Sequence, residues 1–189
     1  MLVIVEKDCV YFAESVPMMQ PTGREWQKMD AEDLNFFHPD GSHALIGAVG
    51  RNSKADADAL RYENPPLRGE LNVPLLHNKV IPELYDTLDA LGHLSDGETL
   101  STLLFAKGGS AYAVDSLTRI VRLDSDTAFA GWGLLDVMQY SLRRNAHLPV
   151  LERICKAFEV AGEMQQKNLF PLYVMNTKTM QTLYVEGRK

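Results

Sequence analysis

The order of strand-like and helix-like segments constrains the fold of this chain more than any single motif does. A β-branched run, Leu2–Val5, is followed by the polar turn Glu6–Asp8 and a second apolar run, Cys9–Ala13. This pattern predicts a tight hairpin at the start of the chain. After the turn signal His38–Gly41, the apolar segment His43–Val49 predicts a buried strand.

Two helices are expected after this strand. The first can be capped by Asn52 or Ser53, and the second starts near Asn72 and ends at Gly92. Pro82 lies inside the second helical pattern, so we expect a kink there or a helix that restarts.

The second half of the chain predicts four short strands, two helices and a closing pair of strands. The strands are expected at 102–106, 111–115, 120–123 and 127–130, and the closing pair at 172–175 and 180–185. The helices are expected at Leu134–Leu142 and from Leu148-Pro149 onward. The second of them has an apolar stripe at helical spacing, made of Leu151, Ile154, Cys155, Phe158 and Gly162.

This order favours an α+β fold in which helices cover both faces of a pair of sheets. Two antiparallel sheets packed face to face, with a helix pair outside each, would bury every apolar face in the series. No repeat, low-complexity tract or linker interrupts the 189 residues, a length that suits one domain. The sequence therefore predicts a four-layer αββα sandwich formed by a single domain, residues 1–189.

Composition narrows the possible partners. The formal net charge is −6, and an acidic balance argues against a nucleic-acid partner, which needs a basic face. No stretch approaches the roughly 20 apolar residues of a membrane helix, and the first residues lack the pattern of a signal peptide. The two distant cysteines, Cys9 and Cys155, fit reduced thiols better than a disulfide framework. We expect a cytoplasmic protein that binds neither nucleic acid nor membranes.

Five short motifs occur in this order with the spacing of a known family. They are His43–Gly50 with its glycine turn, the small-residue helix start Lys54–Leu60, the strand Ala111–Asp115, the glycine-rich strand end Thr127–Gly133, and the long helix start Leu148–Ala157. With the order of elements, these motifs resemble the proteasome β subunit and the bacterial HslV peptidase, which share the N-terminal-nucleophile hydrolase fold. The resemblance covers roughly residues 2–176.

The resemblance implies a hydrolase site whose chemistry this sequence does not supply. In that fold the first residue of the mature first strand, a Thr, Ser or Cys, attacks a carbonyl, and its own α-amine is the base. Here the strand begins with Met1 and Leu2, which cannot be activated as nucleophiles. The family's other catalytic positions, an Asp, a Lys and the Ser of Gly-Ser-Gly, fall on Ser15, near Asp33 or Leu34, and on Trp132. The acidic residue near the end of the long helix corresponds to Glu163.

We therefore expect a catalytically inactive, proteasome-like subunit that assembles with copies of itself. The resemblance implies rings that stack through outer helices, and residues 53–63 and 73–91 are the candidates. Whether an unfoldase or another protein joins the assembly stays open. One alternative is an active HslV-like peptidase that uses a noncanonical nucleophile or one supplied by a partner subunit. Another is a module that binds a small ligand or peptide in the old substrate cleft.

Other polar clusters have simpler interpretations than catalysis or metal binding. His38, Asp40 and His43 flank a turn, and two histidines with one carboxylate on a short loop are a weak metal signal. Gly108-Gly109 lacks the rest of a phosphate loop and is interpreted as a β-turn. Cys9 would become a nucleophile only if the first strand were removed, so it is interpreted as a buried thiol. We expect no metal site and no cofactor.

Overall fold

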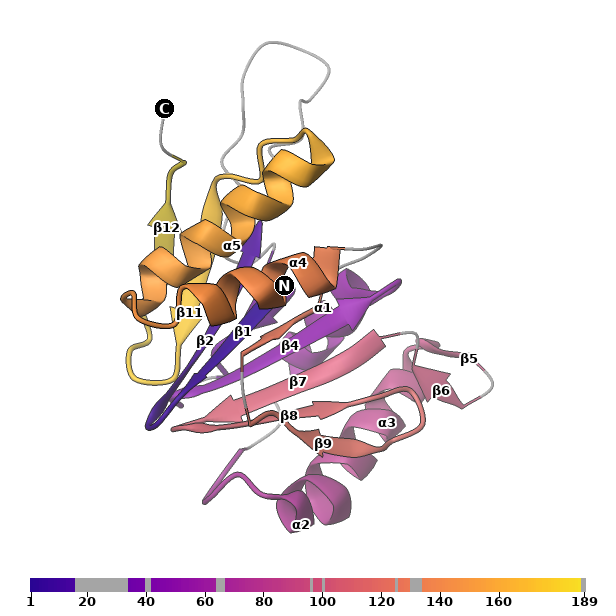
Figure 1. The fold of residues 1–189 in the computed structure, drawn as a ribbon. Helices are drawn as coiled ribbons and strands as arrows, with labels where there is room; N and C mark the ends of the chain where they lie inside the picture. Colours follow the sequence, from indigo (N-terminus) through magenta and orange to yellow (C-terminus); the bar gives the residue numbers. More distant parts are fainter. Residues whose placement is uncertain are drawn as a thin grey trace.

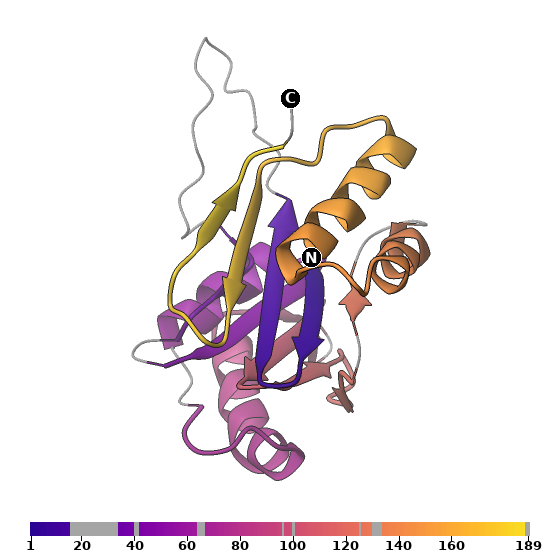
Figure 2. The ribbon, with the colours of Figure 1, turned by 60° about the vertical axis from the view of Figure 1, so that its left-hand side comes forward.

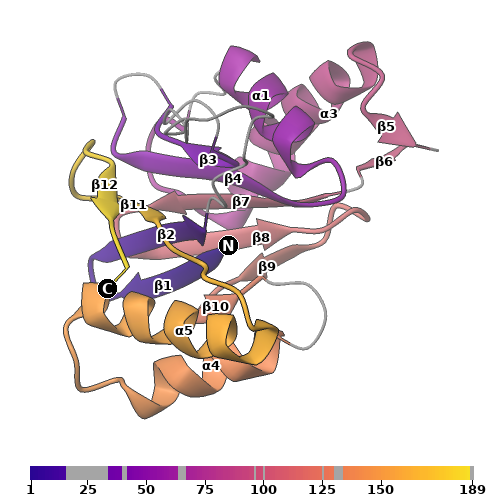
Figure 3. The same ribbon diagram turned by 90° about the horizontal axis from the view of Figure 1, so that it is seen from above.

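The computed structural model has the layers that the sequence predicts: two antiparallel sheets in the middle and helices on both outer sides (Figure 1). It describes residues 1–15, 34–39, 42–63, 67–95, 97–99, 101–124, 126–129 and 134–187. Seen from above, the helices α1 and α3 cover one sheet, and α4 and α5 cover the other (Figure 3). In these residues no helix combines the length and the apolar character needed to cross a membrane.

The first sheet is built around the predicted hairpin. Its five strands lie in the order β10-β1-β2-β11-β12. Their bounds are β1 (Leu2–Glu6), β2 (Cys9–Ser15), β10 (Thr127–Ala128), β11 (Leu172–Asn176) and β12 (Leu183–Val185). In the hairpin Leu2 is opposite Ala13 and Val3 is opposite Phe12. Strands from the two ends of the chain are therefore neighbours, because β11 pairs with β2.

The second sheet has the order β3-β4-β7-β8-β9. Its strands are β3 (Phe36–Phe37), β4 (Ala44–Gly50), β7 (Ser101–Lys107), β8 (Ser110–Val114) and β9 (Ile120–Arg122). A small hairpin, β5 (Leu94–Ser95) with β6 (Glu98–Thr99), lies outside it. The strands expected near 45, 104, 113 and 121 are confirmed, whereas β3, β5 and β6 are too short to give a periodic pattern.

The helices follow the predicted sequence with one local change. Their bounds are α1 (Ser53–Glu63), α2 (Val73–Leu75), the π-helical turn η2 (Leu76–Val80), α3 (Ile81–Ala90), α4 (Leu134–Arg144) and α5 (Val150–Gln165). The interruption expected at Pro82 takes the form of this π-helical turn, after which α3 restarts with the proline in its first turn. A proline lacks an N–H and is tolerated at that position.

Two predicted strands are shorter than expected. Of the strand predicted at 127–130, the structure describes residues 127–129, and among these Thr127 and Ala128 pair, opposite Val3 and Leu2. The strand predicted at 180–185 begins only at Leu183. A turn precedes it, in which the Asn176 side chain accepts hydrogen bonds from the backbone N–H groups of Lys178 and Thr179.

Three apolar layers hold the sandwich together. Phe12, Phe36 and Leu104 belong to the layer between the sheets. One outer layer packs α1 and α3 on the second sheet, and the other packs α4 and α5 on the first. Each fully buried Leu, Ile or Phe contributes about 1.5–3 kcal/mol to folding.

Two hydrogen bonds of Thr177 and a close backbone contact at Gly109 join the two sheets at the end opposite the head of β1, and we call this region the clasp. The Thr177 hydroxyl accepts a hydrogen bond from the backbone N–H of Val10 (2.9 Å) and donates one to the carbonyl of Gly108 (2.6 Å). Gly109 packs so closely on the β1–β2 turn that an added Cβ would overlap the backbone carbonyl of Lys7. Three loops from distant parts of the sequence are therefore fixed together.

Candidate functional site

A pocket of about 700 Å³ opens at the head of β1, between the two sheets. The residues that line it come from both sheets and from the starts of α1 and α4, and they are Met1, Glu14, Asn35, Ala48, Val49, Gly50, Arg51, Ser53, Phe129 and Leu135. We call this the β1 pocket.

Met1 forms one wall of the β1 pocket. Its α-amine donates a hydrogen bond to the carbonyl of Phe129 (2.9 Å), and its carbonyl accepts one from the Phe129 N–H (2.9 Å). Burial lowers the pKa of the Met1 α-amine, and the nearby Glu14 carboxylate partly opposes that shift. The backbone of Met1 is thus bound to the segment that follows β10.

Glu14 lies on the strand next to Met1. Leu2 pairs with Ala13, so continuing the register by one residue sets Glu14 beside Met1, on the same face of the sheet. One Glu14 oxygen accepts a hydrogen bond from the Asn35 side-chain amide (2.6 Å), and the other accepts one from the Asn35 backbone N–H (3.1 Å). Among the residues that the structure describes, the hydrogen-bond partner of this carboxylate is therefore a neutral amide residue.

The structure brings together only part of the predicted site. Met1 lines the β1 pocket, whereas the Leu2 side chain packs in the layer under the helices, on the other face of the sheet. Ser15 lies opposite Leu172 and does not line the pocket. Asp33 and Trp132 lie outside the described residues.

Sequence reasoning placed the acidic position on Ser15, next to Glu14, and it missed Asn35. The turn has two residues, so Glu6 pairs with Cys9 and residue 14 is set against residue 1, whereas the expected three-residue turn Glu6–Asp8 would shift this register by one. Asn35 had no comparable signal, since it follows a segment without a periodic pattern.

The chemistry available in the β1 pocket is limited. Among its described lining residues Ser53 carries the single hydroxyl, and none carries a thiol or an imidazole. Ser53 is the first residue of α1 and belongs to the other sheet's helix layer. A carboxylate, an amide and the Arg51 guanidinium can bind a polar ligand, but these residues do not form a nucleophile–base pair.

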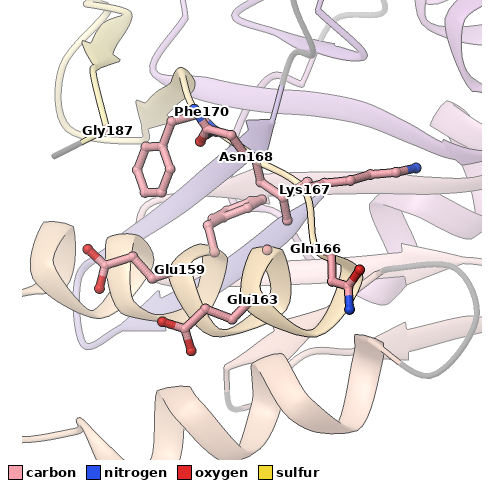
Figure 4. Close-up of a pocket in the computed structure, with 10 residues that line it drawn as sticks. Glu159, Glu163, Gln166, Lys167, Asn168, Phe170 and Gly187 are labelled. Atoms are coloured by element: carbon pink, nitrogen blue, oxygen red, sulfur yellow. Dashed lines mark hydrogen bonds between the residues drawn. The ribbon is translucent and has the colours of Figure 1, made fainter. Parts of the chain in front are cut away.

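Glu163, the predicted acidic residue of the long helix, lies elsewhere. It lines a second pocket of about 480 Å³, between the C-terminal half of α5 and the chain around Phe170 (Figure 4). The lining of this pocket and that of the β1 pocket share no described residue.

Of the predicted histidine cluster, the structure describes His38 and His43. His38 Nδ1 lies 2.7 Å from the carbonyl oxygen of Ala44, and burial lowers the pKa of His38. In the residues that the structure describes, no group of three His, Cys, Asp or Glu side chains could hold a metal ion. Asp40 is not among those residues.

The layers, the sheet order and a pocket at the head of the first strand define a proteasome-like N-terminal-nucleophile hydrolase fold. A search of solved structures finds the same class. Neither a scan of protein-family models nor a search of curated proteins gives a match.

Among the solved structures, BPH from Thiobacillus denitrificans superposes with a TM-score of 0.66 at 12% identity, covering 98% of both chains. Anbu (ancestral beta-subunit) from Yersinia bercovieri gives 0.59 at 11% identity, covering 98% of this chain and 86% of the other. HslV from Trypanosoma brucei gives 0.54 at 14% identity, covering 93% and 97%. The fold is shared, while most side chains differ.

Proposed function

We propose that this chain is a catalytically silent proteasome-like subunit that associates with copies of itself in a structural role. One observation carries the proposal. The residue that precedes the first strand and lines the β1 pocket is Met1, whose thioether cannot attack a carbonyl. Losing the nucleophile of a hydrolase removes several orders of magnitude of rate.

The partners of Glu14 support the same proposal. The resemblance implies a lysine that lowers the pKa of the nucleophile, and the group that binds the Glu14 carboxylate is the neutral amide of Asn35. An amide has no positive charge with which to stabilise an anionic nucleophile. Among the described residues, restoring the first residue alone would leave this second requirement unmet.

Self-association is supported by apolar side chains left in solvent on the outer helices and the edge strands. Large apolar residues exposed by 40% or more include Tyr62, Val73, Val121, Tyr140, Leu151 and Met164. Exposed apolar surface of this kind marks interaction sites. A cytoplasmic location and a single domain belong to the proposal, and the absence of a disulfide at Cys9 and Cys155 among the described residues supports the location.

The test combines activity with mass. Purified protein is assayed with fluorogenic peptides and with a covalent probe for N-terminal nucleophiles, and its native mass is measured by analytical ultracentrifugation. We expect no turnover above the buffer rate, no probe adduct, and a mass of several chains. Robust turnover that Ser53→Ala abolishes would replace the proposal with an active hydrolase. A monomer at micromolar concentration would end the claim of self-association.

The β1 pocket also favours a second candidate, a module that binds a peptide or small polar ligand. The pocket has a volume of about 700 Å³ and offers Glu14, Asn35 and Arg51 as polar contacts. A thermal-shift screen of short peptides would detect such binding. A ligand whose stabilising effect is lost in Arg51→Ala would support it, and unchanged melting temperatures across the screen would count against it.

A further inference from the structure

The long helix α5 has more apolar surface than the fold covers. Of its predicted stripe, Ile154 and Phe158 are buried against the first sheet, whereas Leu151 is 40% exposed. Cys155, four residues after Leu151, is only half-buried. Residues four apart lie on one helix face, so a partly uncovered strip runs from Leu151 to Cys155 in the first half of α5.

A groove runs beside this strip. A pocket of about 200 Å³ adjoins the 480 Å³ pocket of Figure 4, and the two share Glu159 and Phe170. One wall is α5 and the other includes Val185 at the end of the edge strand β12. We call this the α5–β12 groove and define it by Leu151, Cys155, Glu159, Glu163, Phe170 and Val185.

The α5–β12 groove is acidic. Its charged lining residues are four carboxylates, Glu152, Glu159, Glu163 and Glu186, and two ammonium groups, Lys156 and Lys167. Lys156 is paired with Glu159 at 2.7 Å. A partner for this groove should therefore supply positive charge next to an apolar anchor.

The outer face of α4 offers positive charge next to an exposed apolar side chain. Met138, Ser141 and Leu142 face the sheet and are buried, which leaves Tyr140 63% exposed on the opposite face. Arg143 and Arg144 follow one turn later and are exposed. Within the described part of the chain, neither guanidinium forms a salt bridge. Tyr and Arg are the residues most enriched in interface hot spots.

The two surfaces lie at opposite edges of the same layer. In the sheet order β10-β1-β2-β11-β12, α4 packs on β10 and the groove borders β12 (Figure 2). A contact between α4 of one copy and the groove of the next would use two different patches. Such a head-to-tail contact leaves one free patch on each outer copy, so it adds copies side by side, and it closes as a ring when the rotation between neighbouring copies closes.

We propose that the α5–β12 groove receives the α4 face of a second copy of this chain, with Tyr140 as the apolar anchor and Arg143 and Arg144 against the groove carboxylates. The inference rests on the proposed self-association and adds which two surfaces meet.

Charge reversal in each half tests it. The two variants are Arg143→Glu/Arg144→Glu and Glu152→Arg/Glu186→Arg. We expect each to raise the dissociation constant of self-association, measured by sedimentation velocity, by at least about tenfold, equivalent to ~1.4 kcal/mol. Each double variant places like charges on both sides of the contact. The combined quadruple variant swaps the two charges, so opposite charges face each other again and association should recover. The matched control is Arg119→Glu/Arg122→Glu, which reverses two exposed arginines near the far edge of the other sheet and should not change the mass.

Thiol labelling supplies a second measurement. Cys155 in the groove should react with a thiol reagent more slowly in the assembled wild type than in the Arg143→Glu/Arg144→Glu variant, and Cys155→Ser gives the background rate. If the wild type is oligomeric and both reversals keep its mass and labelling rate, this inference is overturned while self-association stands. If the wild type is a monomer, the proposed function itself fails.

Discussion

Asn35 binds both carboxylate oxygens of Glu14, one through its side-chain amide and the other through its backbone N–H. Glu14 lies on β2 of the first sheet and Asn35 immediately precedes β3 of the second, so this contact ties the two sheets together beside Met1.

Removing the amide should therefore cost stability. Asn35→Ala leaves one Glu14 oxygen without its partner, and an unsatisfied polar group of this kind costs about 1–3 kcal/mol. Urea denaturation followed by circular dichroism measures the loss. In the double variant Glu14→Gln/Asn35→Ala the penalty should be smaller than the sum of the two single changes, because the carboxylate charge is gone. Strict additivity would show that the contact contributes nothing.

Gly109→Ala should destabilise the clasp between the sheets. Its Cβ would overlap the Lys7 carbonyl oxygen and lie 2.8 Å from the carbonyl carbon, so the hairpin turn must move. Overpacking against backbone costs about 3 kcal/mol, near the upper end of its usual range. Thermal unfolding measures the difference.

The control is the neighbouring Gly108→Ala. Gly108 has a φ of 57° and open space around its Cβ position, so only the left-handed backbone penalises alanine there, by about 1 kcal/mol. If the Gly108 variant proved the less stable of the two, the close approach at Gly109 would not matter.

Arg153 should be among the least replaceable charged residues. Its side chain is 8% exposed, and it pairs with Glu6 on β1 at 2.8 Å and with Asp126 next to β10. Arg153→Met leaves the Asp126 carboxylate, which is 15% exposed, without its cationic partner. Breaking a buried pair in this way lowers the free energy of unfolding by about 3–5 kcal/mol. The free energy of unfolding in guanidinium chloride measures it.

Neutralising the carboxylates should recover part of that loss. In Arg153→Met/Asp126→Asn/Glu6→Gln no buried charge is left unpaired, so the triple variant should be more stable than the single one. A triple variant less stable than Arg153→Met would contradict this account.

His38 should make stability fall in mild acid. Burial lowers the pKa of His38 below its usual 6.5, against the opposing effect of its hydrogen bond with Ala44. The unfolded chain therefore takes up the proton first as the pH falls through 6.5, so stability that is present above this pH is lost below it. Unfolding midpoints between about pH 7.5 and about pH 5.5, roughly one pH unit on either side of the usual histidine value, should show the decline.

His38→Gln should flatten that decline, while the exposed His147→Gln should leave it unchanged. The same slope in the His38 variant as in the wild type would assign the acid sensitivity to another group.

Much of the architecture could be predicted because its patterns are local. The hairpin of β1 and β2, the run β7-β8-β9 and the long helix α5 each have their own periodicity or turn residues. The short strands β3 and β6 have only two residues each, too few for a period, and depend on neighbours such as Gly47 opposite Phe36. Tertiary pairing alone defines them.

The candidate site was predictable only in part for a related reason. Met1 follows from the start of the first strand, whereas the Glu14–Asn35 contact joins residues separated by a segment without a periodic pattern. Motif matching assigned the acidic position to Ser15, but strand alternation decides which of two adjacent residues faces the pocket, and it selects Glu14. A one-residue difference in register exchanges one side of a strand for the other.

The pairing of β2 with β11 also determines when the first sheet can be completed during synthesis of the chain. When a ribosome has made the first half of this chain, β1 and β2 exist but both of their outer partners, β10 and β11, are still missing. After residues 9–15 the ribosome must add more than 150 residues before β11 exists, which at ~5–20 residues per second takes roughly ten seconds or more. During that interval an apolar strand with an open edge can pair with a neighbouring nascent chain. Premature termination before residue 172 should thus be far more harmful to solubility than a point mutation in the β1 pocket.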